Sequence, residues 1–348
     1  MIGIGIIGCG KIAQFRHIPE YLDNSHVEIR GYFDLNRDRA MELSEKYGGK
    51  VYDTVDDLLS APDIDAVSVC SANNVHAEHT IKALNAGKHV LCEKPMAVKL
   101  EDCEKMIQAA QKNKKYLMID QNQRMAKAHM KASDLIEKGE IGRIISFRTA
   151  FGHGGPETWS IDQGSDTWFF NKERAVMGAM ADLGIHKTDL IQYLTDSRVV
   201  EVTAVVTTLD KCYSNGKRIG VDDNAFCIYK MNNGIIGTMT ASWTYYGEED
   251  NSTILYGSKG IMKIYFDPDY SIEIINKDGS KVFYEIDQIQ TNDNQTKSGI
   301  IDEFINSIVQ KKAPSISGES VLTAMRAVFA CLEASEQGRV VSVNQNIS

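Results

Sequence analysis

The first 120 residues alternate between short β-branched runs and helical patterns, and this alternation limits the possible folds more than any other feature. Runs typical of strands occupy residues 2–7, 27–33, 64–70, 88–92 and 116–120. Helical patterns lie between them, such as 36–48, which ends on a glycine, and 99–115, which has an apolar period of about 3.6 residues. Strands that are apolar almost throughout and alternate with helices predict an α/β domain with a parallel sheet covered on both faces.

The pattern changes after about residue 125. Helices are expected at 127–138, 181–195, 298–311 and 319–336, and strands at 144–151, 199–209, 223–231, 234–245, 252–258, 261–266 and 271–276. Asn-Gly within 231–236 and Asp-Gly within 276–281 are strong hairpin signals. The second half is therefore predicted to be an α+β domain with a large, mostly antiparallel sheet. A length of 348 residues also suggests two domains, which we place at 1–124 and 125–348.

Composition excludes several classes of partner. The chain is 43% hydrophobic and 24% charged with a net charge of −9, and it has no Lys/Arg cluster suited to a phosphate backbone, so nucleic acid is not expected. No apolar run approaches the roughly 20 residues that span a bilayer, so no membrane is expected. Seven scattered cysteines without a CxxC, and a start without a basic, cleavable leader, predict a cytoplasmic protein.

A glycine-rich turn joins the first strand to the next helix. It reads Gly8-Cys9-Gly10-Lys11-Ile12-Ala13, a G-x-G-x-x-A. This motif is weak alone, but here it follows a strand and opens a helix, which is the context that dinucleotide binding requires. The first glycine permits the turn, the second lets the backbone approach a pyrophosphate, and the helix N-terminus supplies amide donors. The sequence thus predicts a Rossmann domain, a doubly wound parallel sheet, rather than a ligand-free glycine turn.

Asp34 ends the second strand, where an acidic side chain hydrogen-bonds the adenosine ribose. A carboxylate at this point repels a 2′-phosphate and favours NAD. Arg37 and Arg39 follow closely and could meet that phosphate instead, which leaves NADP open as the alternative.

Two further motifs carry polar side chains. Glu93-Lys94-Pro95 ends a buried strand, at the edge where open α/β sheets bind ligands. Asp182 and His186 lie four residues apart on an expected helix, which puts their Cβ atoms about 5–6 Å apart on one face. Alone, the lysine could equally be a surface residue neutralised by Glu93, and the second pair could be an ordinary surface pair. A metal site is not expected, because no His/Cys/Asp cluster supplies a third ligand at recognisable spacing.

In the order G-x-G-x-x-A, E-K-P, D-x-G-x-H, the chain resembles the glucose–fructose oxidoreductase/inositol dehydrogenase (Gfo/Idh/MocA) family over almost its whole length. The resemblance implies an NAD(P)-dependent enzyme that oxidises a secondary hydroxyl of a sugar, inositol or related polyol. It implies a second domain that binds substrate and forms a homodimer or homotetramer. It also implies cofactor contacts beyond the glycine turn from Arg37, Ser71, Asn73, His76, Glu93, Lys94 and Arg124.

The chain departs from the family pattern at several points. Ser71 and Ala72 stand where the family has Thr and Pro, and Met177 replaces the first glycine before the D-x-G-x-H motif. The methionine is expected to narrow or redirect the substrate entrance. Asn122, at the joint between the domains, is assigned to the substrate.

In oxidation, a base must take the hydroxyl proton as the C–H bond breaks, and histidine suits this because its ordinary pKa lies near working pH. We assign His186 as base, Asp182 as the group that orients it or binds a second hydroxyl, and Lys94 as the group that stabilises developing alkoxide charge. His153 and Trp168 are the expected substrate contacts, although both residue types also pack in cores. Two alternatives remain: a glycosidase of the same family that uses bound NAD, and a non-catalytic nucleotide-binding regulator.

Overall fold

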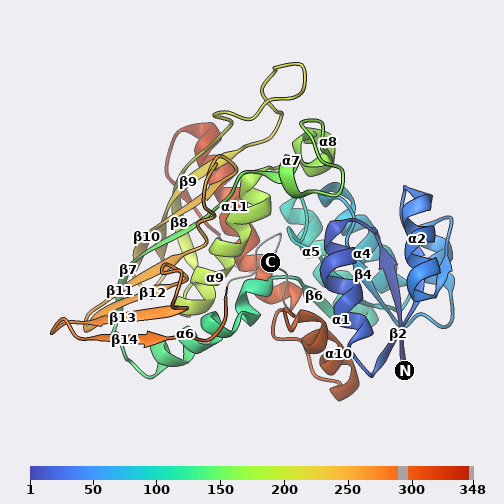
Figure 1. Cartoon of the computed structure of the whole chain (residues 1–348), viewed down its shortest axis with the longest axis horizontal. Helices are drawn as coiled ribbons and strands as arrows, with labels where there is room; N and C mark the ends of the chain where they lie inside the picture. Colours follow the sequence, from blue (N-terminus) through green and yellow to red (C-terminus); the bar gives the residue numbers. More distant parts are fainter. Residues whose placement is uncertain (289–296, 345–348) are drawn as a thin grey trace. The chain divides into compact units, whose positions relative to one another are not determined.

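The computed structural model describes residues 1–288 and 297–344 and divides the chain into two compact units (Figure 1). Unit 1 comprises 1–122 and 297–322, and unit 2 comprises 123–288 and 323–344. The boundary expected at residue 124 therefore leaves out residues 297–322, which return to unit 1. Helix α10 (Ile300–Gln310) belongs to unit 1 because its buried apolar side packs there, next to α1 (Ile18–Leu22), and Ser298 donates its amide to the Glu20 carboxylate.

Unit 1 contains a six-stranded, fully parallel sheet in the order β3-β2-β1-β4-β5-β6. Its strands are β1 (Ile2–Ile7), β2 (Val27–Phe33), β3 (Lys50–Val51), β4 (Ala66–Val69), β5 (His89–Cys92) and β6 (Leu117–Ile119). Its other helical segments are a π-helical turn (Ala13–His17), α2 (Arg37–Tyr47), α3 (Val55–Ser60), a 3-10 turn (Asn73–Val75), α4 (His76–Asn85) and α5 (Leu100–Asn113). This strand order confirms the predicted Rossmann fold, in which ligands bind beyond the carboxyl ends of the strands where the order reverses, between β1 and β4.

Unit 2 contains a nine-stranded sheet in the order β14-β13-β12-β11-β7-β10-β9-β8-β15. Its strands are β7 (Ile144–Gly152), β8 (Val199–Thr207), β9 (Asn224–Met231), β10 (Ile236–Ser242), β11 (Thr253–Gly257), β12 (Gly260–Ile264), β13 (Ile272–Asn276), β14 (Lys281–Tyr284) and β15 (Val341–Ser342). Neighbouring strands are antiparallel except β7 and β10, which run parallel. The predicted large, mostly antiparallel sheet is confirmed.

The helices of unit 2 include α9, which packs against β7 and α6. The helical segments are a 3-10 turn (Asn122–Met125), α6 (Lys127–Glu137), α7 (Pro156–Trp159), a 3-10 turn (Trp168–Phe170), α8 (Lys172–Ala175), a π-helical turn (Met180–Gly184), α9 (Ile185–Thr195) and α11 (Gly318–Gln337), of which residues 318–322 are assigned to unit 1 and the rest to unit 2. The helix expected over 181–195 thus begins with π-helical geometry, so α-helical spacing does not apply from Asp182 to His186. Among the described residues, no helix is both long and apolar enough to cross a membrane.

Candidate functional site

The glycine turn of unit 1 has the backbone geometry that the motif predicts. Gly8 has φ of 94°, and a Cβ atom there would lie 2.6 Å from the backbone of Cys70, so the position requires glycine. A Cβ atom at Gly10 would meet none of the described atoms within 4 Å, which leaves this part of the turn open to a ligand. The turn therefore fits a pyrophosphate approaching the backbone of Gly10, beside the start of the following helical segment.

The carboxylate of Asp34 lies at this turn. Its Oδ2 accepts the Cys9 amide at 2.6 Å and its Oδ1 accepts the Asn36 amide at 2.7 Å, and the residue is partly exposed. A carboxylate oxygen has more than one acceptor site, so these bonds fix Asp34 and leave capacity for ribose hydroxyls. The Arg37 guanidinium is paired with the Asp53 carboxylate.

The loop after β4 contains the expected Ser71, Asn73 and His76. The His76 ring is buried, with Nδ1 2.8 Å from the carbonyl of Pro95 and Nε2 2.8 Å from the carbonyl of Ser71. A direct hydrogen bond from His76 to the cofactor would have to break one of these contacts. The ring instead joins the loops that follow β4 and β5. Ser71 contacts the His79 ring, and Asn73 is buried.

Glu93, directly after β5, is buried and uses both carboxylate oxygens. Oε1 lies 3.0 Å from Nε2 of His17, and Oε2 accepts the backbone amide of Lys94 at 3.2 Å. Asp120, directly after β6, lies 3.4 Å from the same His17 nitrogen. Glu93 therefore reaches any cofactor only through the position that it gives Lys94, whose own side chain is half-buried.

Electrostatics in this cluster are governed by burial and by pairing. Burial alone would lower the pKa of the His17 ring, but the neighbouring Cys70 and the carboxylates of Asp120 and Glu93 raise it well above its usual value. Burial alone would raise the pKa of Glu93, but the hydrogen bond with His17 and the nearby positive charges hold it below its usual value. Burial and the charge of Glu93 raise the pKa of Asp120.

His17, Glu93 and Asp120 also form the one group in the described part of the chain whose ligand atoms lie close enough to share a metal ion. Sequence spacing did not reveal this group, because its members come from a helical turn and two strand ends far apart in the chain. Arg16 lies 3.8 Å from Asp120, so one guanidinium and one imidazolium balance the two carboxylates without a metal. We therefore interpret the group as an ion-pair cluster.

In unit 2, Asp182 is held by a neutral donor. The indole nitrogen of Trp243 donates to Asp182 Oδ2 at 3.0 Å, and His153 Nε2 lies 3.9 Å from the same oxygen. Trp243 is fully buried just after β10 and was missed from the sequence, because it lies 61 residues from Asp182. His186 is 7% exposed, and its ring centroid lies 6.1 Å from that of Phe151.

The turn that carries Asp182 is anchored by Asp222. The amides of Gly178 and Met180 donate to the two oxygens of this buried carboxylate, each at 2.7 Å. A Cβ atom at Gly178 would lie 1.8 Å from the Asp222 carbonyl oxygen, so only glycine fits there. Met177 is 3% exposed, so its side chain packs in the interior of unit 2 and presents little surface to a ligand. The predicted narrowing of the substrate entrance by Met177 stays a prediction.

Aromatic rings extend from His186 in one continuous series of contacts. In order, the members are His186, Phe151, His153, Trp159, Phe169 and Trp168, with centroid separations of 4.0–6.1 Å. The expected substrate residues His153 and Trp168 both belong to this series, although His153 is buried and Trp168 is half-buried. Trp159, Phe151 and Phe169 were not selected from the sequence, where aromatic residues near His153 carry no signal that separates core from site.

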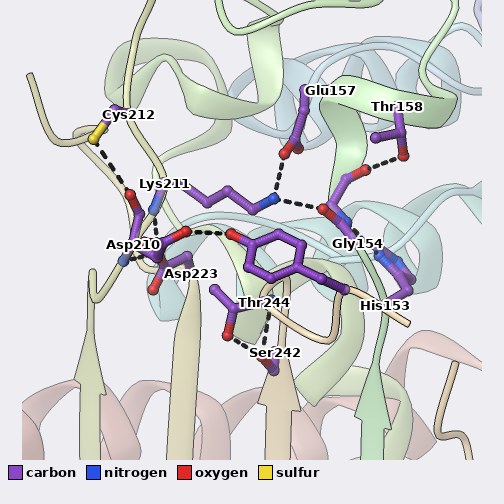
Figure 2. A network of polar contacts seen from close by, with 12 residues as sticks. His153, Gly154, Glu157, Thr158, Asp210, Lys211, Cys212, Asp223, Ser242 and Thr244 are labelled. Atoms are coloured by element: carbon purple, nitrogen blue, oxygen red, sulfur yellow. Dashed lines mark hydrogen bonds and ion pairs between the residues drawn. The ribbon is translucent and has the colours of Figure 1, made fainter. Parts of the chain in front are cut away.

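A polar network holds the loop that follows His153 in the chain (Figure 2). Asp223 accepts the amides of Leu209, Asp210 and Lys211, and the Lys211 ammonium then bonds the Gly154 carbonyl and Glu157. The Gly155 amide donates to His153 Nδ1 at 3.0 Å. A nitrogen that accepts a hydrogen bond carries no proton, so this contact assigns His153 as the neutral Nε2–H tautomer. His153 is then a hydrogen-bond donor toward Asp182.

Two other charged side chains of unit 2 belong to α9 or contact it, the helix that carries His186. Arg124, expected at the cofactor, forms a two-bond ion pair with Asp189 of α9. Lys187 is fully buried and donates to the Asn251 carbonyl at 2.8 Å. Burial lowers the pKa of Lys187 to about 7, against the opposing charges of Asp250 and Glu249.

Comparison with known proteins agrees with both halves of this description. Residues 2–121 match an oxidoreductase family with an NAD-binding Rossmann fold, and residues 129–263 match the GFO/IDH/MocA C-terminal domain. D-glucoside 3-dehydrogenase of Escherichia coli is 31% identical over 66% of this chain and 67% of its own. Myo-inositol 2-dehydrogenase of Thermotoga maritima is 27% identical over 99% of both chains. The crystal structure of aldose-aldose oxidoreductase from Caulobacter crescentus complexed with glycerol has a TM-score of 0.82 at 26% identity, covering 98% of this chain and 99% of that one.

Proposed function

This chain belongs to the Gfo/Idh/MocA family of oxidoreductases, and we propose that it moves a hydride between a secondary hydroxyl of a sugar, inositol or related polyol and a nicotinamide. The family assignment makes the protein an NAD-dependent oxidoreductase with an NAD-binding Rossmann domain, acting on CH–OH groups of sugar-like substrates. The observation that best supports this proposal is the glycine turn with Asp34, since Gly10 leaves the backbone open where a pyrophosphate must approach.

The reacting groups that we propose are Lys94, Asp182 and His186. When bound, the nicotinamide supplies the acceptor or donor of the hydride. His186 takes the hydroxyl proton in oxidation and returns it in reduction, while the Lys94 ammonium stabilises negative charge on the reacting oxygen. The Asp182 carboxylate accepts the Trp243 indole N–H and lies 3.9 Å from His153 Nε2, which supports a role in orienting the His186 imidazole or binding a second hydroxyl. We assign substrate contacts to Asn122, His153 and Trp168.

The tautomer of His153 separates its role from that of His186. Its Nδ1 accepts the Gly155 amide, so only Nε2–H faces away from the loop, and that group donates. A donor of this kind can bind a substrate oxygen but cannot remove its proton. This supports His186, rather than His153, as the base.

NAD is the preferred cofactor in this proposal. The Asp34 carboxylate is fixed by two backbone amides and would repel a 2′-phosphate, and Arg37 is held by Asp53. Arg39 follows closely in the sequence and keeps NADP as the alternative cofactor. The remaining cofactor contacts that we propose come from Cys9, Lys11, Ile12, Ser71, Asn73 and Arg124. His76 and Glu93, whose polar atoms are engaged within unit 1, are proposed to shape the cofactor pocket through the loops that they hold.

Substitution tests the reacting groups directly. With an identified substrate, His186→Ala and Lys94→Ala should each lower kcat about 100- to 10,000-fold while NADH still binds, because proton transfer and charge stabilisation are lost in the transition state. His26→Ala and Lys99→Ala, at exposed positions, are the matched controls and should keep wild-type kcat. Near wild-type kcat in both site variants would refute the assignment.

We also propose that the chain forms a homodimer or homotetramer through the sheet of unit 2. Exposed apolar side chains lie on one face of β8, β9 and β10, namely Val205, Phe226, Ile228 and Ile236. A second copy would cover this face. Light scattering should give two or four chains, and Phe226→Glu should lower that number; a monomeric wild type would refute the proposal. All seven cysteines are unpaired, which supports the proposed cytoplasmic location.

A further inference from the structure

His17 occupies an unusual place for a fully buried ring. It ends the π-helical turn after the glycine motif, and its Nδ1 lies 3.0 Å from the hydroxyl of Ser68 in β4. Its Nε2 lies 3.0 Å from Glu93 and 3.4 Å from Asp120. One ring therefore contacts the ends or interiors of three neighbouring strands of unit 1.

The two carboxylates determine the charge of this ring. Glu93 and Asp120 are 5% and 1% exposed, and an unpaired carboxylate at such burial costs several kcal/mol. A neutral ring with its proton on Nδ1 would turn an Nε2 lone pair toward both carboxylates, which is repulsive, and a neutral ring with its proton on Nε2 would leave the two buried carboxylates with only the positive charge of Arg16 in the cluster. An imidazolium instead donates from Nε2 to Glu93 and faces Asp120, and Arg16 adds the second positive charge near Asp120. The cluster is then neutral as a whole.

The Glu93 carboxylate transmits this arrangement to the neighbouring turn. Its Oε1 contacts His17, while its Oε2 accepts the amide of Lys94. On the other side of the turn, the Pro95 carbonyl contacts the His76 ring at 2.8 Å. The backbone that carries the Lys94 side chain is thus held from two sides by buried imidazoles, one of them acting through a carboxylate.

We propose that His17 is a positioning residue for Lys94. Held as an imidazolium between Glu93 and Asp120, it fixes the Glu93 carboxylate, and that carboxylate orients the backbone from which Lys94 projects. This inference rests on the proposed role of Lys94 in the reaction. It goes beyond that role by assigning the group that keeps Lys94 in place.

The first experiment uses the full chain without added cofactor. In protein labelled with ¹⁵N-histidine, the His17 ring, identified by its loss in His17→Gln, should carry protons on both nitrogens from about pH 6 to about pH 8. An unprotonated ring nitrogen at neutral pH would overturn the imidazolium. Stoichiometric metal in the isolated protein that disappears in His17→Gln would also overturn it, because the cluster would then be a metal site.

The second experiment measures Lys94 itself. Reductive methylation of the full chain, followed by mass spectrometry of the Lys94 peptide, should proceed about threefold or more faster in His17→Gln than in wild type, because the loosened turn opens more often. Lys99 labelling should not change in the same samples. His89→Gln is the matched control, since His89 lies at the opposite end of β5 and bonds the Tyr116 amide. An unchanged Lys94 rate in His17→Gln would refute the positioning role.

The third experiment separates positioning from general damage to the fold. His17→Gln keeps an N–H donor for Glu93 but loses the positive charge that fixes the carboxylate, so kcat should fall about 10- to 100-fold while substrate KM and NADH affinity change little. Ser68→Ala removes only the Nδ1 partner and should lower kcat less. A fall in Tm without a fall in kcat would assign His17 to structure alone. If Lys94→Ala keeps activity, the proposed role of Lys94 in the reaction fails, whereas the labelling result would still decide the link between His17 and Lys94.

Discussion

His17 in unit 1 and Lys187 in unit 2 are both fully buried bases, yet their pKa values shift in opposite directions. The pKa of His17 rises well above its usual value, because two carboxylates lie at its Nε2. The pKa of Lys187 falls to about 7, because burial dominates and its ammonium bonds a neutral carbonyl. Within the described residues, no carboxylate forms an ion pair with Lys187. Burial sets the cost of a charge, and the bonded partner decides whether the charge remains.

The largest effect is expected from His17→Ala, which removes the imidazolium that Glu93 and Asp120 share and leaves the two buried carboxylates with the charge of Arg16 near Asp120. The free energy of unfolding should fall by about 3–5 kcal/mol near pH 7, measured by urea denaturation. The raised pKa of His17 makes its contribution complete below 6.5 and lost only as pH rises through the higher folded value. The lowered pKa of Glu93 makes its contribution complete above 4.5 and lost as pH falls. The destabilisation should therefore shrink below about pH 4.5.

His17→Gln is the control for that measurement, since it retains an N–H donor and should lose less stability than the alanine variant. Equal stability of wild type and His17→Ala at neutral pH would show that the carboxylates are already protonated. The ion-pair account of unit 1 would then be wrong.

Lys187→Met should have the opposite dependence on pH. In the unfolded chain the lysine keeps its ordinary pKa of 10.5, so between about pH 7 and 10 the unfolded state binds more protons than the folded state. Wild-type stability should consequently rise with pH relative to Lys187→Met, by about 2 kcal/mol between pH 7 and pH 9. The exposed Lys99→Met should show no such difference. A wild type that loses stability relative to Lys187→Met as pH rises would mean that Lys187 is paired in the fold.

Trp243→Phe should have the smallest effect of the three. It removes one neutral hydrogen-bond donor to Asp182 and breaks no ion pair, so it should lower the free energy of unfolding by about 1.5 kcal/mol. Because the indole does not titrate, the difference should be constant from about pH 6 to pH 9. Asp182 would also lose its orientation, so kcat should fall about tenfold. A larger loss of stability than in His17→Ala would reverse the order that the comparison predicts.

Much of the fold could be predicted because its signals are local. The strand over Val27–Phe33 and the helix over Lys127–Glu137 show clear runs and periods, and the structure places them within a residue of their expected ends. The two-residue strands β3 and β15 have no period to detect and exist only through their partners. The assignment of α10 to unit 1 likewise depends on tertiary packing, which its own sequence does not reveal.

The motifs of the candidate site could be predicted from the sequence, but the residues that hold those motifs in place could not. The glycine turn and Asp34 lie together as expected, because they end neighbouring strands. By contrast, Trp243 and Asp222 reach the Asp182 turn from loops far away in the sequence, next to the ends of β10 and β9. His17 lies four residues beyond the glycine motif, where it reads as an ordinary helix residue until the strand ends are assembled.

The central claim is hydride transfer between a sugar-like secondary hydroxyl and NAD. The direct test is a panel of sugars and inositols with NAD and NADP, followed by nicotinamide absorbance and by release of any glycoside leaving group. The account predicts NADH formation with at least one polyol or sugar, a lower rate with NADP, and loss of the signal in His186→Ala. Leaving-group release without net NADH would indicate a glycosidase, and NADH binding with no redox change across the panel would indicate a regulator. Either result would contradict the account.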